Sequence, residues 1–473
     1  MNKAAPNLVI SEEKAFEVWA QICGHINGMA LGGSLLALRV AGHLKGAPLT
    51  LDRMNGNAGY LNGLLHAMAA MGWLNEPVDG VWDWTDAGRD LIRQADLLEH
   101  IPTLLDAADA LLDRADCDLP DIASVPAPLG LILQGYLLAP LMLGCAARQD
   151  AIAPPNSHAT LRALGWIDEN GAFNDLGQIA LSQAGAYHYP VTYLPTLARV
   201  GELLFGDPMG LRARTATQEE THVDRARDIL FSGLVYQHSV GPAIWDRLRD
   251  VLTSAQAPRY ILDLGCGDGQ MLAEIGKRAP SVQLIGMEYN RVAQATAAER
   301  ISGFPNAFVI AGDIGAPQAT IAALTERGID PKDVLLITKS VVHNRSWTPP
   351  TGPLVSGDTH AMAATPDGAI ITGDALAQNL TEFFAAWHPF VGPHGFFVIE
   401  PHAIARATLR ANLHRSIGPC LEYTHCLSNQ LLVQADCLRR CAGLAGFVSR
   451  YSTGIGAGTL GYDHMSVDHF FVA

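Results

Sequence analysis

The second half of the chain, from Arg259 onward, alternates short apolar runs with helix-length amphipathic segments. That alternation is typical of βαβ units and predicts a parallel sheet covered by helices. Segments 447–452 and 462–473 alternate apolar and polar residues, and we expect them to close the sheet as an antiparallel pair. Parallel strands are expected to begin at Tyr260, Val282, Ala307, Val334 and Phe396.

Two stretches of the first half repeat one pattern, residues 68–88 and residues 161–177. In each, a helix runs into Gly-Trp, an acidic turn follows, and an aromatic residue, an Asp and a Gly close the segment. A helix, a short hairpin and a second helix in this order are typical of a winged helix. We therefore expect a mainly helical N-terminal half with two winged-helix-like units, 1–100 and 101–183, then a helical connector or lid, 184–255, and an α/β domain, 256–473.

A winged helix usually binds DNA through a basic recognition helix. Here the corresponding helix, residues 51–74, has Arg53 as its only basic residue. The whole chain has 32 Lys and Arg against 47 Asp and Glu, a net charge of −15. This balance argues against nucleic acid or an anionic membrane surface as a partner. We expect the two units to pack against another subunit, in a possible homodimer, or to cover an active site.

The composition is that of a globular protein, with 49% hydrophobic and 17% charged residues over 473 positions. The eight cysteines form no C-x-x-C pair and the start of the chain lacks a signal-peptide pattern, so we expect a cytoplasmic protein. Residues 122–147 carry no charge and could cross a bilayer by length. Three prolines and Gln134 interrupt them, and a buried helical hairpin is the better interpretation.

The strongest motif lies in residues 260–290. An apolar strand runs into Gly265, Gly267 and Gly269, and a helix opens at Gln270. Glycines let the backbone pass close under a ligand, and a helix N-terminus favours an anionic group. Nicotinamide-dinucleotide folds use a similar loop, although their third glycine ideally follows the second by three residues. The loop alone therefore predicts a nucleotide-type cofactor without identifying it.

Three acidic residues help to identify which cofactor the glycine loop binds. Asp263 precedes the glycines, where a carboxylate suits an ammonium group better than a pyrophosphate. Glu288 follows Gly269 by 19 residues and could hold two ribose hydroxyls, and Asp313 could reach an adenine amine. Together with the sequence D-L-G-C-G-D-G, this pattern resembles motif I of class I S-adenosylmethionine (SAM)-dependent methyltransferases. The resemblance implies a Rossmann-like domain that binds SAM through Asp263, Gly265, Gly267, Gly269, Glu288, Tyr289, Asp313, Ile314 and Lys339.

Nine of the seventeen histidines lie in the last 131 residues, and the first of them, His343, follows the fourth expected strand. Ligands of open α/β folds bind at that edge of the sheet. The triplet His343-Asn344-Arg345, with G-D-A-L-A-Q-N-L at 373–380, is similar to the metal-dependent C-methyltransferase domains of polyketide synthases, of the apratoxin loading-module type. Shorter matches lie at 222–225, 237–238 and 424–430.

That resemblance implies a mononuclear iron or manganese site with His343 and Gln378 as ligands, and a malonyl-type substrate on an acyl carrier protein. No carrier segment is recognisable, so the substrate is expected on a carrier in trans or as a free small acid. A divalent metal would stabilise the enolate that carbon methylation needs, and one imidazole with one amide suits iron or manganese. His425 is the preferred base for the α-proton and His238 the reserve.

Each of these residues also has a plainer interpretation. His343 could be the general base of a metal-independent O-methyltransferase, Gln378 a surface amide, and His425 a partner of buried backbone groups. The sequence thus predicts a SAM-dependent C-methyltransferase of polyketide or natural-product biosynthesis, with a small-molecule O-methyltransferase that uses a His base as the alternative. A SAM-sensing winged-helix regulator is disfavoured by the acidic first unit.

Overall fold

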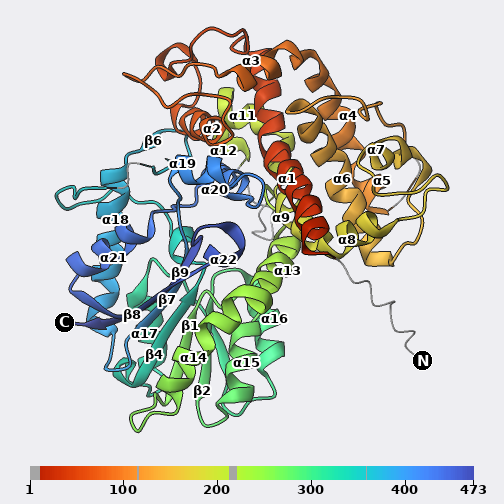
Figure 1. The fold of residues 1–473 in the computed structure, drawn as a ribbon. Helices are drawn as coiled ribbons and strands as arrows, with labels where there is room; N and C mark the ends of the chain where they lie inside the picture. Colours follow the sequence, from red (N-terminus) through yellow and green to blue (C-terminus); the bar gives the residue numbers. More distant parts are fainter. Residues whose placement is uncertain (1–10, 114, 116, 212–220, 358–359) are drawn as a thin grey trace, which may run out of the picture. The chain divides into compact units, whose positions relative to one another are not determined.

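The computed structural model describes residues 11–113, 115, 117–211, 221–357 and 360–473, apart from the side chains of residues 230, 234, 238 and 239 (Figure 1). The chain forms two compact units. The N-terminal unit contains the described residues up to Phe231 together with Pro366–Ala369 and Arg406–Leu427. The C-terminal unit contains Ser232–Thr365, Ile370–Ala405 and Ser428–Ala473. The finer division into four domains expected from sequence stays a prediction.

The C-terminal unit is built on a seven-stranded sheet with the order β3-β2-β1-β4-β7-β9-β8. The first five strands in this order are parallel, and β9 pairs antiparallel with both β7 and β8. This confirms the α/β fold with five parallel strands and an antiparallel closing pair. The strands are β1 (Tyr260–Leu264), β2 (Gln283–Glu288), β3 (Phe308–Ala311), β4 (Val334–Lys339), β7 (Phe396–Pro401), β8 (Phe447–Ile455) and β9 (Met465–Val472). A separate ribbon joins β5 (Ala363–Ala364) and β6 (Ile370–Ile371).

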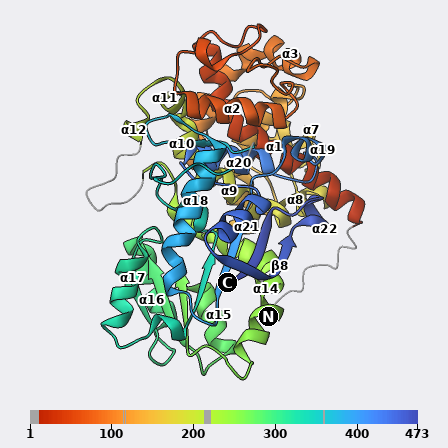
Figure 2. The ribbon, with the colours of Figure 1, turned by 90° about the vertical axis from the view of Figure 1, so that its left-hand side faces the viewer.

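Successive strand residues face opposite sides of the sheet, and each side is covered by helices. Leu262, Leu336 and Val398 pack on one side, under α17 (Pro317–Thr325), α18 (Gly373–Trp387) and α21 (Ala435–Leu444). Figure 2 shows α18 and α21, which contact one another. The other side is covered by α14 (Gly241–Leu252), α15 (Gln270–Arg278) and α16 (Arg291–Ile301). Short helical turns connect these elements: η5 (Tyr236–Val240), η6 (Pro331–Asp333), η7 (Val342–Asn344), η8 (His388–Phe390) and α22 (Ala457–Leu460).

The N-terminal unit is helical, as expected. Its long helices α1 (Glu12–Val40) and α6 (Leu129–Arg148) pack along one another. Helix α13 (Arg225–Val235) contains the division between the units at Phe231. The other helices of this unit are α2 (Ala58–Ala70), α3 (Asp86–Arg93), α4 (His100–Asp106), α5 (Ala108–Asp113), α7 (His158–Ala163), α8 (Asp175–Gln183), α9 (His188–Thr192), α10 (Leu194–Ala198), α11 (Val200–Phe205), α12 (Pro208–Leu211), α19 (Arg406–Ala411) and α20 (Gly418–Leu427).

The uncharged segment 122–147 forms most of helix α6. Among the described residues it is the one helix long and apolar enough to cross a membrane, and 89% of its apolar window is buried inside the protein. Gly28 of α1 lies so close to α6 that a Cβ there would come within 2.9 Å of the Ile132 backbone. The apolar composition of α6 thus follows from its place in the core of the N-terminal unit.

The two repeated segments of the N-terminal unit share their local structure. Each has a polar residue that caps the second helix, a glycine three residues later that donates to the cap, and a tryptophan whose carbonyl faces this glycine. A Cβ on either glycine would lie 2.1 or 2.0 Å from that carbonyl oxygen. The residues are Thr85, Gly88 and Trp73 in the first segment and Asn174, Gly177 and Trp166 in the second.

Replacing Gly88 by alanine is therefore expected to destabilise the protein by about 2 kcal/mol or more, because the added methyl overlaps the Trp73 carbonyl oxygen. Gly177→Ala should cost a similar amount at the second segment. Gly201→Ala is the matched control, since its Cβ would make an ordinary contact of 3.7 Å with Ala37. Urea unfolding measures all three variants, and equal midpoints for Gly88→Ala and Gly201→Ala would contradict the tight packing.

Candidate cofactor and active site

The glycine loop follows β1 at the carboxyl edge of the sheet. Gly265, Gly267 and Gly269 have φ angles of +77°, +56° and +78°, a region that other residues rarely adopt. A Cβ on Gly265 would lie 2.6 Å from the Val341 side chain, whereas a Cβ on Gly267 would meet open space. The loop leads directly into α15, whose first residue is Gln270. It therefore has the backbone shape of a loop that passes under a ligand.

Glu288, the last residue of β2, lies beside this loop. One carboxylate oxygen accepts the Gly267 N–H at 2.9 Å, and the other accepts the N–H groups of Tyr289 and Asn290, also at 2.9 Å. The strand end and the glycine loop are thus tied together through one carboxylate. This places Glu288 where an acid could hold a ribose bound over the loop.

Asp263 lies within β1 and is 1% exposed. Burial raises the pKa of its carboxyl to about 8; Glu288 and Asp268 add to the rise, and Lys339 opposes it. The Oδ1 atom is buried without a hydrogen bond. Lys339, at the end of β4, donates to the Ser232 hydroxyl at 2.7 Å. A buried carboxyl with an unsatisfied oxygen is suited to a cationic ligand such as an ammonium group.

Asp313 and Ile314 follow β3. The Asp313 carboxylate accepts the Gly315 N–H at 2.8 Å and so caps its own turn. The Ile314 carbonyl accepts the Trp387 indole N–H at 2.9 Å, which anchors this loop to α18. Tyr289 is 60% exposed. These residues lie after neighbouring strands of one sheet, as the cofactor assignment expects, but their contacts with a cofactor stay predictions.

His343 lies in η7, four residues after β4. Its Nδ1 atom is 2.5 Å from Oε1 of Glu400 in β7, and its backbone N–H donates to the same oxygen at 2.7 Å. The two side chains are 5% and 2% exposed. Since this oxygen already accepts the backbone N–H, we assign the Nδ1 proton to the imidazole, which places its basic lone pair on Nε2. Glu400 was not predicted as a site residue. The feature that could have identified it is a single acidic residue at the end of an apolar strand.

The His343–Glu400 pair and the glycine loop share one edge of the sheet. Strand β4 lies between β1 and β7, and all three run parallel. Val341, two residues before His343, is the residue that Gly265 packs against. A base and a cofactor loop at neighbouring strand ends form the arrangement that a group-transfer enzyme needs.

The structure gives little support to the expected iron or manganese site. Gln378 is 7% exposed, so it is not a surface amide, but its Nε2 donates to Glu382 at 3.2 Å. Arg345 donates to Asn379 at 2.8 Å, which joins the His343 turn to α18. No group of three or more His, Cys, Asp or Glu among the described residues could hold a metal ion. A carboxylate on the other ring nitrogen is also common at metal-bound histidines, so the assignment of His343 and Gln378 as ligands stays a prediction.

The structure describes the side chain of only one of the two expected bases, His425 and His238. His425 lies in α20 of the N-terminal unit, and its Nδ1 faces the Leu421 carbonyl at 2.6 Å and the Tyr189 hydroxyl at 3.1 Å. His343 belongs to the C-terminal unit, so the structure does not bring the two imidazoles together within one unit. The side chain of His238 lies outside the described residues. Both assignments stay predictions.

The fold and the glycine loop define a class I SAM-dependent methyltransferase, and SAM is therefore its cofactor. Within this class, residues 220–455 match the model of the AprA MT2-like domain, and this half of the chain belongs to that family. Both findings confirm the resemblance seen in the sequence.

Other similarities are partial or distant. The trans-aconitate 2-methyltransferase of Acidovorax ebreus (strain TPSY) is 35% identical over 78 residues, 14% of this chain and 30% of the relative's length. The chain thus spans about a third of the curated relatives it matches. Among solved structures, an O-methyltransferase family 2 protein from Planctomyces limnophilus in complex with apigenin has a TM-score of 0.42 at 12% identity, covering 98% of both chains. The CurJ carbon methyltransferase has a TM-score of 0.38 at 11% identity, covering 95% of this chain and 92% of its own.

Proposed function

We propose that this protein is a C-methyltransferase that moves the methyl group of SAM to an activated acyl carbon, with His343 as the general base. The buried His343–Glu400 pair, at the same sheet edge as the glycine loop, is the observation that carries the proposal. The match to the AprA MT2-like family supports an acyl substrate, either bound to a carrier protein or free.

The reaction follows from the protonation state of the pair. Glu400 holds the Nδ1 proton of His343, so Nε2 takes a proton from a carbon that lies between two carbonyl groups. The carbon then uses the electron pair of the broken C–H bond to attack the sulfonium methyl. A C–C bond forms as the S–CH₃ bond breaks, and S-adenosylhomocysteine leaves. Glu400 stabilises the imidazolium that results.

O-methylation is the second candidate, because a histidine held by a carboxylate can also deprotonate an acidic hydroxyl without a metal. Product analysis separates the two. The protein is incubated with SAM labelled as CD₃ and either an acetoacetyl thioester, free or on an acyl carrier protein, or a phenol. We expect the label on the α-carbon by NMR. Label on oxygen alone would establish the second candidate, and no labelled product from either substrate would contradict both.

Metal removal tests whether methyl transfer by this protein requires a bound metal, as it does in the metal-dependent C-methyltransferases that the sequence resembles. Dialysis against a strong chelator is expected to leave the rate of methyl transfer within about twofold, because no cluster of three or more His, Cys, Asp or Glu able to hold a metal lies among the described residues. Gln378→Ala should likewise keep most of the activity. A loss that iron(II) or manganese(II) restores would instead assign His343 and Gln378 as ligands.

The affinity for SAM is expected to rise with pH between about 6 and 7.5. The buried Asp263 carboxyl has its pKa raised to about 8 and is protonated over this range, whereas an ammonium ligand needs the carboxylate. Binding therefore releases a proton, and affinity rises by up to about tenfold per pH unit. Calorimetry at several pH values measures the slope. Asp263→Asn should remove it, and a flat wild-type profile would contradict the assignment.

The same shift has a consequence for folding. The folded protein keeps the Asp263 proton up to about pH 8, while the unfolded chain loses it near pH 4. The folded state thus binds more protons over this window, so Asp263 makes the unliganded protein less stable as pH rises from 4 to 8. Asp263→Asn should raise the unfolding midpoint of the unliganded protein at pH 7.5.

A further inference from the structure

We infer that the side-chain carbonyl oxygen of Gln430 is a fixed hydrogen-bond acceptor that selects substrates with an N–H or O–H group beside the reacting carbon. This inference rests on the proposed function, because it takes the site around His343 to be the site that holds the methyl acceptor. Gln430 lies in the C-terminal unit, in the segment after α20.

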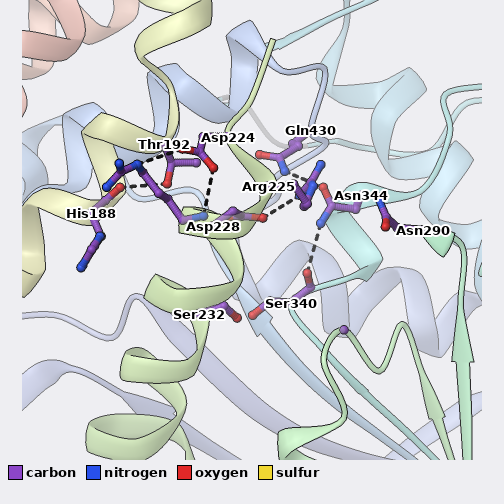
Figure 3. A network of polar contacts seen from close by, with 12 residues as sticks. His188, Thr192, Asp224, Arg225, Asp228, Ser232, Asn290, Ser340, Asn344 and Gln430 are labelled. Atoms are coloured by element: carbon purple, nitrogen blue, oxygen red, sulfur yellow. Dashed lines mark hydrogen bonds and ion pairs between the residues drawn. The ribbon is translucent and has the colours of Figure 1, made fainter. Parts of the chain in front are cut away.

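Two side-chain amides in series determine the orientation of Gln430. The Asn344 amide nitrogen donates to the Ser340 carbonyl at 3.2 Å, so Asn344 turns its oxygen toward Gln430. The Gln430 nitrogen donates to that oxygen at 2.5 Å (Figure 3). A backbone carbonyl can only accept a hydrogen bond, so the Ser340 carbonyl determines the orientation of the Asn344 amide and, through it, that of the Gln430 amide. The Gln430 amide nitrogen is used in this series, so the side-chain atom that is left to face a ligand is the oxygen Oε1.

Ser340, the first residue of this series of hydrogen bonds, is itself held in place. Ser340 has a φ angle of +56°, and its N–H donates to the Ile399 carbonyl at 2.8 Å. The carbonyl that orients both amides is thus anchored to strand β7. Rotation of the two amides would cost the hydrogen bonds along the series, so the acceptor is built into the site.

Gln430 is adjacent to the proposed base. Asn344 directly follows His343, and the N–H of Leu431 donates to the His343 carbonyl at 2.7 Å. Gln430 is therefore tied to the His343 turn from two directions. Its Oε1 atom is buried and has no hydrogen-bond partner, and the Ser428 hydroxyl in the same segment shares this property. Buried polar atoms in native proteins normally have partners, so a ligand is expected to supply the missing donor.

The chemistry of the ligand follows from the acceptor. A carboxylate or carbonyl oxygen placed against Gln430 Oε1 would leave two acceptors facing one another, which is unfavourable. An amide N–H, as in a pantetheine arm, or a hydroxyl would satisfy it. The methyl acceptor is thus a molecule with a hydrogen-bond donor close to its activated carbon.

Acetoacetamide and N,N-dimethylacetoacetamide form a suitable pair, since both have a carbon between two carbonyl groups and only the first has N–H groups. Binding of each to the protein saturated with S-adenosylhomocysteine is followed by NMR titration. We expect acetoacetamide to bind about tenfold more tightly, the usual effect of leaving a buried acceptor unpaired. In Gln430→Leu the two dissociation constants should become equal, mainly through weaker binding of acetoacetamide.

Two further variants separate specificity from structure. Asn344→Ala frees the Gln430 amide to rotate and should reduce the preference, while Gln318→Leu, which removes an exposed amide of α17, should leave it unchanged. Equal binding of the two amides by the wild type, failure of both to bind, or a preference that survives Gln430→Leu would overturn the inference. Failure of the proposed function would appear separately, as binding with the expected preference but no methyl transfer to carbon.

Discussion

Replacing His343 by alanine is expected to slow methyl transfer about a thousandfold, the usual effect of removing a general base. The affinity for SAM should stay within about twofold, because the glycine loop and Asp263 remain intact. The physical reason is that Glu400 contacts Nδ1 of His343, so Nε2 is the ring nitrogen assigned to take the proton. Single-turnover kinetics measure the methyl-transfer step, and calorimetry measures SAM binding to the same preparation.

Two companion variants sharpen this prediction. Glu400→Gln keeps the shape of the side chain but can donate to Nδ1, which would place the proton on Nε2, so its rate should fall by about a hundredfold or more. His414→Ala, which removes an exposed imidazole, is the control and should retain full activity. A His343→Ala enzyme with near wild-type single-turnover rates would exclude His343 as the base.

Gly265→Ala is expected to weaken SAM binding by about thirtyfold or more. Two effects act together: alanine is strained at a φ angle of +77°, and its Cβ would lie 2.6 Å from the Val341 side chain. Each effect costs on the order of 1–3 kcal/mol, and both move the loop that lies under the cofactor. Calorimetric titration with SAM measures the change.

The matched control is Gly303→Ala. Gly303 is exposed, has no positive φ angle and would meet nothing within 4 Å of an added Cβ. That variant should bind SAM like the wild type. If Gly265→Ala also bound SAM with unchanged affinity, the glycine loop would not be the cofactor loop.

The sheet could be predicted because hydrophobic periodicity is a local property. Strands β1, β4 and β7 begin at the expected residues Tyr260, Val334 and Phe396, and β2 and β3 begin one residue later than expected. Buried parallel strands read as continuous apolar runs, which the glycine loop and helix-length segments separate clearly. The closing strands β8 and β9 were also expected.

The His343–Glu400 pair could only be half predicted, because the two residues are 57 positions apart. Their contact depends on β4 and β7 being neighbours in the sheet, which no local pattern reveals. The same limit applies to Arg406–Leu427, which groups with the N-terminal unit although the sequence around it is that of the α/β domain. It also applies to Gln378, whose burial on α18 was not visible from a polar residue on an amphipathic helix.

The most direct test of the account measures proton removal by itself. Acetoacetamide in D₂O exchanges its α-protons slowly, and the wild-type protein with S-adenosylhomocysteine is expected to accelerate this exchange, because His343 removes the proton without any methyl group to transfer. His343→Ala and Glu400→Gln should exchange at the enzyme-free rate. Equal acceleration by the wild type and by His343→Ala would contradict the central claim that the His343–Glu400 pair activates the carbon that is methylated.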